Sequence, residues 1–117
     1  MNNFKELKVW QKTISFVTDI YKTTATFPKF EIYGISSQIQ RASVSISCNI
    51  SEGCGKTSKK DFKRFLEIAY SSAFEVENLL IICNNLEYTT EEKNSSLITN
   101  IKEIQKMLAG LKASIKI

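Results

Sequence analysis

The sequence contains no histidine, one proline, four glycines and three cysteines. The absence of histidine removes the most common general base and the base of most serine and cysteine triads. The three cysteines form no C-x-x-C pair, so they predict neither a disulfide framework nor a zinc site. We therefore expect a protein that is not an enzyme and that holds no metal and no cofactor.

Long apolar runs are also absent. No stretch approaches the ~18 consecutive apolar residues that a membrane-spanning helix requires. The N-terminal sequence MNNFKELKVWQK lacks the apolar core of a secretory signal, so a cytoplasmic location without membrane attachment is expected. The 117 residues fit a single domain, 1–117, and the net charge of +4 mildly favours a polyanionic partner.

Apolar residues recur at helical spacing in four segments of the chain. We expect helices at about 4–25, 36–52, 59–86 and 91–116. Pro28 ends the first pattern, and a serine at 36 or 37 is the expected cap of the second helix. The S-x-x-D sequence from Ser58 and the T-E-E sequence from Thr90 are capping signatures of the last two. The sequence thus predicts an all-α, up-down four-helix bundle.

The first helical segment carries two apolar stripes, one more than a helix of a small bundle needs. The first stripe has heptad spacing and consists of Leu7, Trp10, Ile14, Val17 and Tyr21. The second stripe lies roughly 120° around the helix, at ~100° per residue, and consists of Val9, Phe16 and Ile20. We assign the first stripe to the bundle seam. The second stripe is either additional core or a candidate oligomer interface.

A polar stripe follows the second predicted helix beside its isoleucines. It lies within roughly 100° of arc and consists of Gln38, Arg41, Ser45, Asn49 and Glu52. Two interpretations stay open: a strip that contacts RNA or a ligand with Arg41 as phosphate anchor, or a hydrogen-bonded seam between helices or subunits. Arg41 and Glu52 are about 16 Å apart along the helix, so they cannot pair within it.

The stretch EGCGKTS, at 52–58, resembles the end of a phosphate-binding loop. The first glycine of that loop is missing, because Ile50 occupies its position, and a helix rather than a strand precedes it. We therefore interpret Gly53 and Gly55 as left-handed residues that end one helix before the next begins.

The densest positive charge follows this corner. The basic run consists of Lys56, Lys59, Lys60, Lys63 and Arg64. Only Asp61 opposes it, and lysines near a helix N-terminus are unfavourable for the helix dipole. Repeated around an oligomer, the run would form a ring of positive potential. It is either a candidate nucleic-acid-binding surface or an ordinary solvated face.

Three segments resemble the four-helix bundle proteins encoded within intervening sequences of bacterial 23S ribosomal RNA: FKELKVWQKTISFVTDIY, FPKFEIYGISSQIQRASVSISCNISEGCGK and FKRFLEIAYSSAFEVEN. The polar stripe and Gly53 match the family's Q-x-x-R-x-x-x-S-x-x-x-N-x-x-E-G pattern, and Glu31 and Gly34 match the segment before it. The chain departs from the family where Cys48 stands in place of alanine and Ser71 in place of glycine.

The family is similar to the accessory variability proteins of diversity-generating retroelements, which look like pentameric barrels with basic surfaces. The resemblance implies a ring-like homo-oligomer, a pentamer, that binds RNA, another nucleic acid or a nucleic-acid enzyme, and it carries over no catalytic activity. Two alternatives stay open. One is a protein–protein scaffold or assembly module without nucleic-acid binding, and the other is a small-ligand or catalytic site around Arg41 and Glu52.

Overall fold

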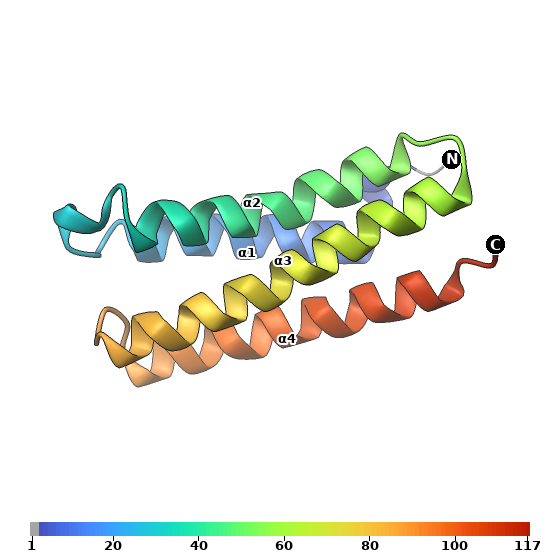
Figure 1. Ribbon diagram of the computed structural model, residues 1–117. Coiled ribbons are helices and arrows are strands. Elements are labelled where there is room, and N and C mark those ends of the chain that lie inside the picture. Colours follow the sequence, from blue (N-terminus) through green and yellow to red (C-terminus); the bar gives the residue numbers. More distant parts are fainter. Residues whose placement is uncertain (1–2) are drawn as a thin grey trace.

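The computed structural model describes residues 3–117 as four helices that run alternately up and down along one bundle (Figure 1). They are α1 (Lys8–Thr24), α2 (Ile35–Cys54), α3 (Lys59–Asn85) and α4 (Glu91–Ser114). Short 3-10 turns, at Phe4–Glu6 and Lys29–Glu31, precede α1 and α2. Each helix packs on the next in sequence, and α4 closes the bundle against α1. The part of the chain that is described contains no strand, so the predicted all-α four-helix architecture is confirmed.

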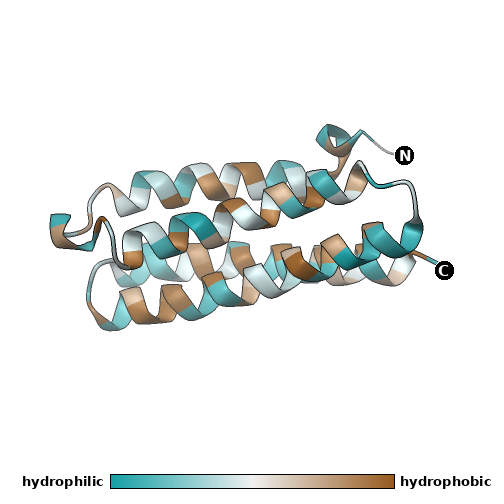
Figure 2. Cartoon of the chain, turned by 45° about the horizontal axis from the view of Figure 1, so that its top comes forward, coloured by the Kyte–Doolittle hydropathy of each residue, from teal (hydrophilic) through white to brown (hydrophobic). Residues whose placement is uncertain are grey.

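The bundle core is built from one face of each helix, and hydrophobic and hydrophilic residues alternate along all four (Figure 2). Heptad spacing in α4 supplies four fully buried residues, Leu97, Ile101, Ile104 and Leu108. One apolar face of α3 is buried along the helix, from Phe62 to Cys83. Ala69 and Ala73 are completely buried, as expected where small side chains let a neighbouring helix approach closely.

Side-chain caps fix the starts of α3 and α4. The Ser58 hydroxyl accepts a hydrogen bond from the Asp61 N–H at 3.1 Å, and the Thr90 hydroxyl accepts one from the Lys93 N–H at 3.0 Å. Each cap satisfies a backbone donor that has no partner inside the helix. Both predicted caps are confirmed.

The predicted serine cap of α2 is wrong, because a carboxylate from the preceding turn takes its place. Oε1 of Glu31 accepts a hydrogen bond from the Ile35 N–H at 3.2 Å, and Gly34 is the N-cap residue. Oε2 of Glu31 accepts a hydrogen bond from the Tyr88 hydroxyl at 2.7 Å. One side chain therefore caps α2 and ties the α1–α2 corner to the α3–α4 corner. A Cβ atom on Gly34 would collide with Oε1 of Glu31, so the glycine leaves room for this cap.

The interpretation of Gly53 and Gly55 as left-handed residues is also wrong. Neither has a positive φ, and α2 continues through Cys54. The reason for a glycine at 53 is close packing: an added Cβ would lie 3.0 Å from the Cβ of Phe65 and 3.1 Å from Cδ1 of Phe62. Gly53 thus lets the end of α2 approach the first turns of α3.

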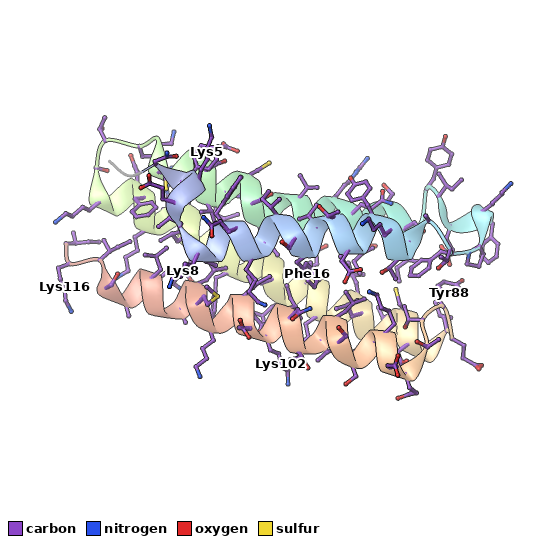
Figure 3. The ribbon with its side chains drawn as sticks, turned by 180° about the vertical axis from the view of Figure 1, so that it is seen from behind. Lys5, Lys8, Phe16, Tyr88, Lys102 and Lys116 are labelled. Carbon is purple, nitrogen blue, oxygen red and sulfur yellow. The ribbon has the colours of Figure 1, made fainter. Side chains whose placement is uncertain are left out.

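Of the two interpretations of the second apolar stripe of α1, additional core is the one that the structure supports. The second stripe, Val9, Phe16 and Ile20, is 4%, 3% and 1% exposed, so it packs in the core of its own chain. It is not available to another subunit, and its assignment as an oligomer interface is wrong. Phe16 lies midway along the bundle (Figure 3).

Two threonines also lie on the buried side of α1, which we call its inner face. They explain why the apolar residues alone understated how far this face extends. Thr13 and Thr24 are buried, and their hydroxyls donate to the carbonyls of Val9 and Ile20 at 2.7 and 2.9 Å. A threonine that satisfies its hydroxyl within its own helix can turn its methyl group to the core. The first stripe lies further out, with Ile14 38% and Tyr21 47% exposed.

Candidate nucleic-acid interface

The basic run lies at the corner where α2 ends and α3 begins. Lys56 is in the connection, and the other four residues occupy the first turns of α3, downstream of the Ser58 cap. Lys59 and Lys60 are exposed, and within residues 3–117 no carboxylate lies within 4 Å of either. Asp61 approaches only Arg64, at 3.8 Å and in solvent, where such a pair contributes little. The run therefore keeps most of its positive charge.

An aromatic ring organises two of these cations. The Lys56 ammonium lies 4.9 Å and the Arg64 guanidinium 4.8 Å from the centre of the Phe65 ring. Cation–π contacts of this kind hold a charge in place without neutralising it. The two charges are consequently held beside the exposed lysines and are not neutralised by the ring that they contact.

The fold adds further lysines to the same end of the bundle. The 3-10 turn that precedes α1 and the C-terminal end of the chain lie beside the α2–α3 corner (Figure 1), and Lys5, Lys8 and Lys116 are at this end (Figure 3). Lys112 is near as well, although it pairs with Glu67 at 2.9 Å. No local sequence pattern predicts this grouping, because residues near 5, 60 and 116 are distant along the chain.

The polar stripe of α2 divides into two parts in the structure. Ser45 and Asn49 are half-buried: the Ser45 hydroxyl shares a hydrogen bond with the Ser72 hydroxyl of α3 at 3.0 Å, and Nδ2 of Asn49 donates to the Ser45 carbonyl at 2.8 Å. Ser45 thus forms a hydrogen-bonded seam between helices, which was one of the two interpretations, and Asn49 supports it from within α2. Gln38, Arg41 and Glu52 are exposed instead.

Arg41 lines a surface cleft of about 480 Å³ between α2 and α3. Gln38, Ser45 and Glu75 also line it. Among the described residues no carboxylate lies within 4 Å of Arg41, although Glu75 faces the same cleft. Glu52 does not line this cleft, and it lies three helical turns further along α2 than Arg41, so the structure does not bring these two together as a site.

The cysteines differ sharply in their surroundings. Cys48 is exposed, whereas Cys54 and Cys83 are buried. Burial, and secondarily the nearby Glu31 carboxylate, raises the pKa of the Cys83 thiol to about 11. Burial also raises the pKa of Cys54. Both buried thiols therefore remain protonated and unreactive.

The pKa of the Tyr88 hydroxyl is raised as well, mainly because this hydroxyl donates a hydrogen bond to the Glu31 carboxylate.

Neither a metal centre nor a membrane span is found over residues 3–117. No group of three or more cysteine, aspartate or glutamate side chains is placed to hold a metal ion. None of the four helices combines the length and apolar character needed to cross a bilayer.

Comparisons with known proteins identify similar chains. The family model described as 23S rRNA-intervening sequence protein matches residues 5–110. A crystal structure of a protein with unknown function from the S23 ribosomal protein family of Bacteroides thetaiotaomicron superimposes with a TM-score of 0.82 and 31% sequence identity. The match covers 91% of this chain and 99% of that one. No curated protein matches the chain.

Proposed function

Because the chain belongs to the 23S rRNA-intervening sequence protein family, we propose that it is a non-enzymatic, ring-like homo-oligomer, a pentamer, that binds RNA in the cytoplasm through its basic end. The observation that carries this proposal is the gathering of positive charge from both termini and the basic run at one end of the bundle. If an enzyme that acts on nucleic acid is bound to the same RNA, it is the protein partner that we expect the ring to contact.

Physical chemistry favours a polyanion at this end. Lys59 and Lys60 sit near the positive end of the α3 dipole, where cations are unfavourable in the free protein. Phosphate groups would neutralise both the lysines and the dipole. A ring repeats the basic end once per subunit, which raises affinity for a long RNA through multiple simultaneous contacts.

The expected contacts are with phosphates, not with bases. Lysine ammonium groups form point-charge contacts with phosphates, and these contacts carry no sequence information. We therefore expect similar affinity for ribosomal RNA fragments and for unrelated RNA of the same length. Each phosphate contact should add about 0.7 to the slope of log affinity against log salt for single-stranded RNA.

The test compares two triple variants that remove the same charge from different places. Lys59, Lys60 and Lys63 are replaced by alanine in the first variant. The control variant carries the same change at Lys29, Lys102 and Lys106, which are exposed residues outside the basic end. Fluorescence anisotropy with labelled RNA at several salt concentrations gives affinity and slope for both.

RNA binding through the basic end predicts that only the first variant loses affinity, with a slope smaller by about 2 for three lost contacts. Equal losses in both variants would indicate attraction by net charge alone and would reject the basic end as the interface. A wild-type protein without salt-dependent RNA binding would favour the alternative function, a protein scaffold. Phe30 and Tyr33, which are 80% and 97% exposed at the opposite end, are the observation that supports that alternative.

A further inference from the structure

The surface cleft that Arg41 lines carries charges of opposite sign from two different helices. Arg41 belongs to α2, whereas Glu75, which lines the same cleft, belongs to α3. Both side chains are exposed. The cleft volume of about 480 Å³ falls within the range of roughly 300–1,000 Å³ that is typical of small-molecule sites. The cleft therefore has room for a small ligand between two opposite charges.

Neither of these charges is neutralised by the protein. Within residues 3–117 no carboxylate lies within 4 Å of Arg41, and no cation lies within 4 Å of Glu75. Glu31, just before α2, is already bound through both oxygens, to the Ile35 N–H and to the Tyr88 hydroxyl. Elsewhere opposite charges on neighbouring helices do pair: Lys12 with Glu103 at 3.2 Å, Lys93 with Asp19 at 2.7 Å, and Lys112 with Glu67 at 2.9 Å. Arg41 and Glu75 differ from these pairs, since each leaves its charge open to the cleft.

Two further polar side chains of α2 lie beside Arg41. Ser37 and Gln38 also line the cleft, and they stand one helical turn before Arg41, so all three share one face of the helix. Over the described part of the chain, neither side chain has a hydrogen-bond partner in the protein. Other serine hydroxyls of α2 donate to carbonyls of their own helix, namely those of Ser43, Ser47 and Ser51. A guanidinium, an amide and a hydroxyl on one face can all donate to a single oxyanion.

The rest of the lining suits the remainder of a small ligand. The Glu75 carboxylate only accepts hydrogen bonds, so it favours an ammonium or amino group. The Tyr33 ring, which is 97% exposed, offers an apolar surface. Ala42 is 4% exposed and the Ser45 hydroxyl is held by Ser72, so this part of the lining is fixed. The cleft thus combines a group of anion-binding side chains, one cation-binding side chain and an apolar ring.

We propose that this cleft binds a small zwitterion of the amino-acid class, whose carboxylate contacts Arg41 and whose ammonium group contacts Glu75. A ligand with an anionic group alone would be attracted by Arg41 but repelled by Glu75, and the reverse holds for a simple cation. A zwitterion is attracted by both. The proposal goes beyond RNA binding, because Arg41 lies in the second turn of α2 whereas the basic run follows the end of that helix.

The test uses a series of amino acids that differ in the distance between their two charges: glycine, β-alanine, γ-aminobutyrate and ε-aminohexanoate. NMR titration of the full chain follows the backbone amide signals of the cleft residues. We expect saturable shifts at these signals for the member whose length matches the gap between Arg41 and Glu75. The matched controls keep the hydrocarbon chain but only one charge, as butyrate and butylamine do for γ-aminobutyrate. Each control should bind about tenfold more weakly, because one charged contact is lost.

Variants of the two charged residues test the orientation of the ligand. Arg41→Gln and Glu75→Gln should each lower the affinity for the best zwitterion by about tenfold. The double variant Arg41→Glu, Glu75→Arg should recover binding, because a zwitterion can enter the other way round. Glu92→Gln and Lys106→Gln, at exposed positions of α4, remove one charge each and should bind as the wild type does. Circular dichroism checks that every variant keeps the helical fold.

Three results would overturn the proposal. The first is that no member of the series gives saturable shifts at the cleft. The second is that butyrate binds as tightly as γ-aminobutyrate, which would indicate a simple anion site. The third is a coupling between Arg41→Gln and Glu75→Gln in the stability of the ligand-free protein, since it would show that the two side chains pair with each other. RNA binding is measured separately through the basic end, so none of these results bears on it.

Discussion

The same substitution, glycine to alanine, should have opposite effects on stability at Gly53 and Gly110. Both glycines lie inside helices, Gly53 in α2 and Gly110 in α4. An added Cβ at Gly110 meets no atom within 4 Å. At Gly53 it would lie 3.0 Å from the Cβ of Phe65 and 3.1 Å from Cδ1 of Phe62.

The magnitudes follow from two competing terms. Alanine in a helix interior is favoured over glycine by about 0.8–1 kcal/mol, because it reduces the entropy of the unfolded chain. Gly110→Ala should gain up to this amount. Gly53→Ala has the same gain in helix propensity, but its Cβ also overpacks the core, which typically costs about 1–3 kcal/mol. The Phe65 Cβ is fixed to the α3 backbone and Phe62 is 1% exposed, so neither can retreat cheaply.

We therefore expect Gly53→Ala to lower the free energy of unfolding by about 1 kcal/mol while Gly110→Ala raises it by about 1 kcal/mol. For a domain of this length, each kcal/mol shifts Tm by roughly 4 °C. Urea and thermal unfolding followed by circular dichroism measure both, at one protein concentration so that any assembly contributes equally. If Gly53→Ala proved as stabilising as Gly110→Ala, the close approach of α2 and α3 would not be the reason for the glycine.

Three other predictions follow from individual side chains. A thiol reagent should label Cys48 rapidly in the native protein and reach Cys54 and Cys83 only on unfolding, so equal labelling rates would contradict their burial. Because the pKa of Cys83 is raised from 9.0 to about 11, the stability it contributes is complete below pH 9 and is lost as the pH rises through 11. Cys83→Ala should thus show a smaller fall in Tm across this window than the wild type. Gly34→Ala should cost about 0.5–2 kcal/mol in chemical denaturation, since its Cβ displaces the Glu31 cap, and an unchanged midpoint would refute that role.

Local sequence was sufficient for the helices and for the buried faces of α3 and α4. The α4 heptad and the α3 face are spaced so that one side of each helix is apolar, and that side has no alternative to burial. The caps at Ser58 and Thr90 involve residues three apart, so their pattern is also visible locally. The basic run was predicted for the same reason, as it is continuous in sequence.

Other features required knowledge of which segments meet. The cap of α2 comes from Glu31, which is held in turn by Tyr88 of the α3–α4 corner, distant along the chain but adjacent in space. Gly53 was misinterpreted as a helix terminator because the Phe62 and Phe65 side chains that demand its small size belong to another helix.

The sequence by itself determined that α1 has two apolar stripes, but the tertiary structure decided which one is the core. Spacing favoured the first stripe, whereas Thr13 and Thr24 concealed the length of the inner face by counting as polar. The positions of α2 and α4 select the inner face, because only one side of α1 can meet both at once. In the same way the sequence contained every lysine of the basic end, and the antiparallel path of the chain brought both termini to the α2–α3 corner.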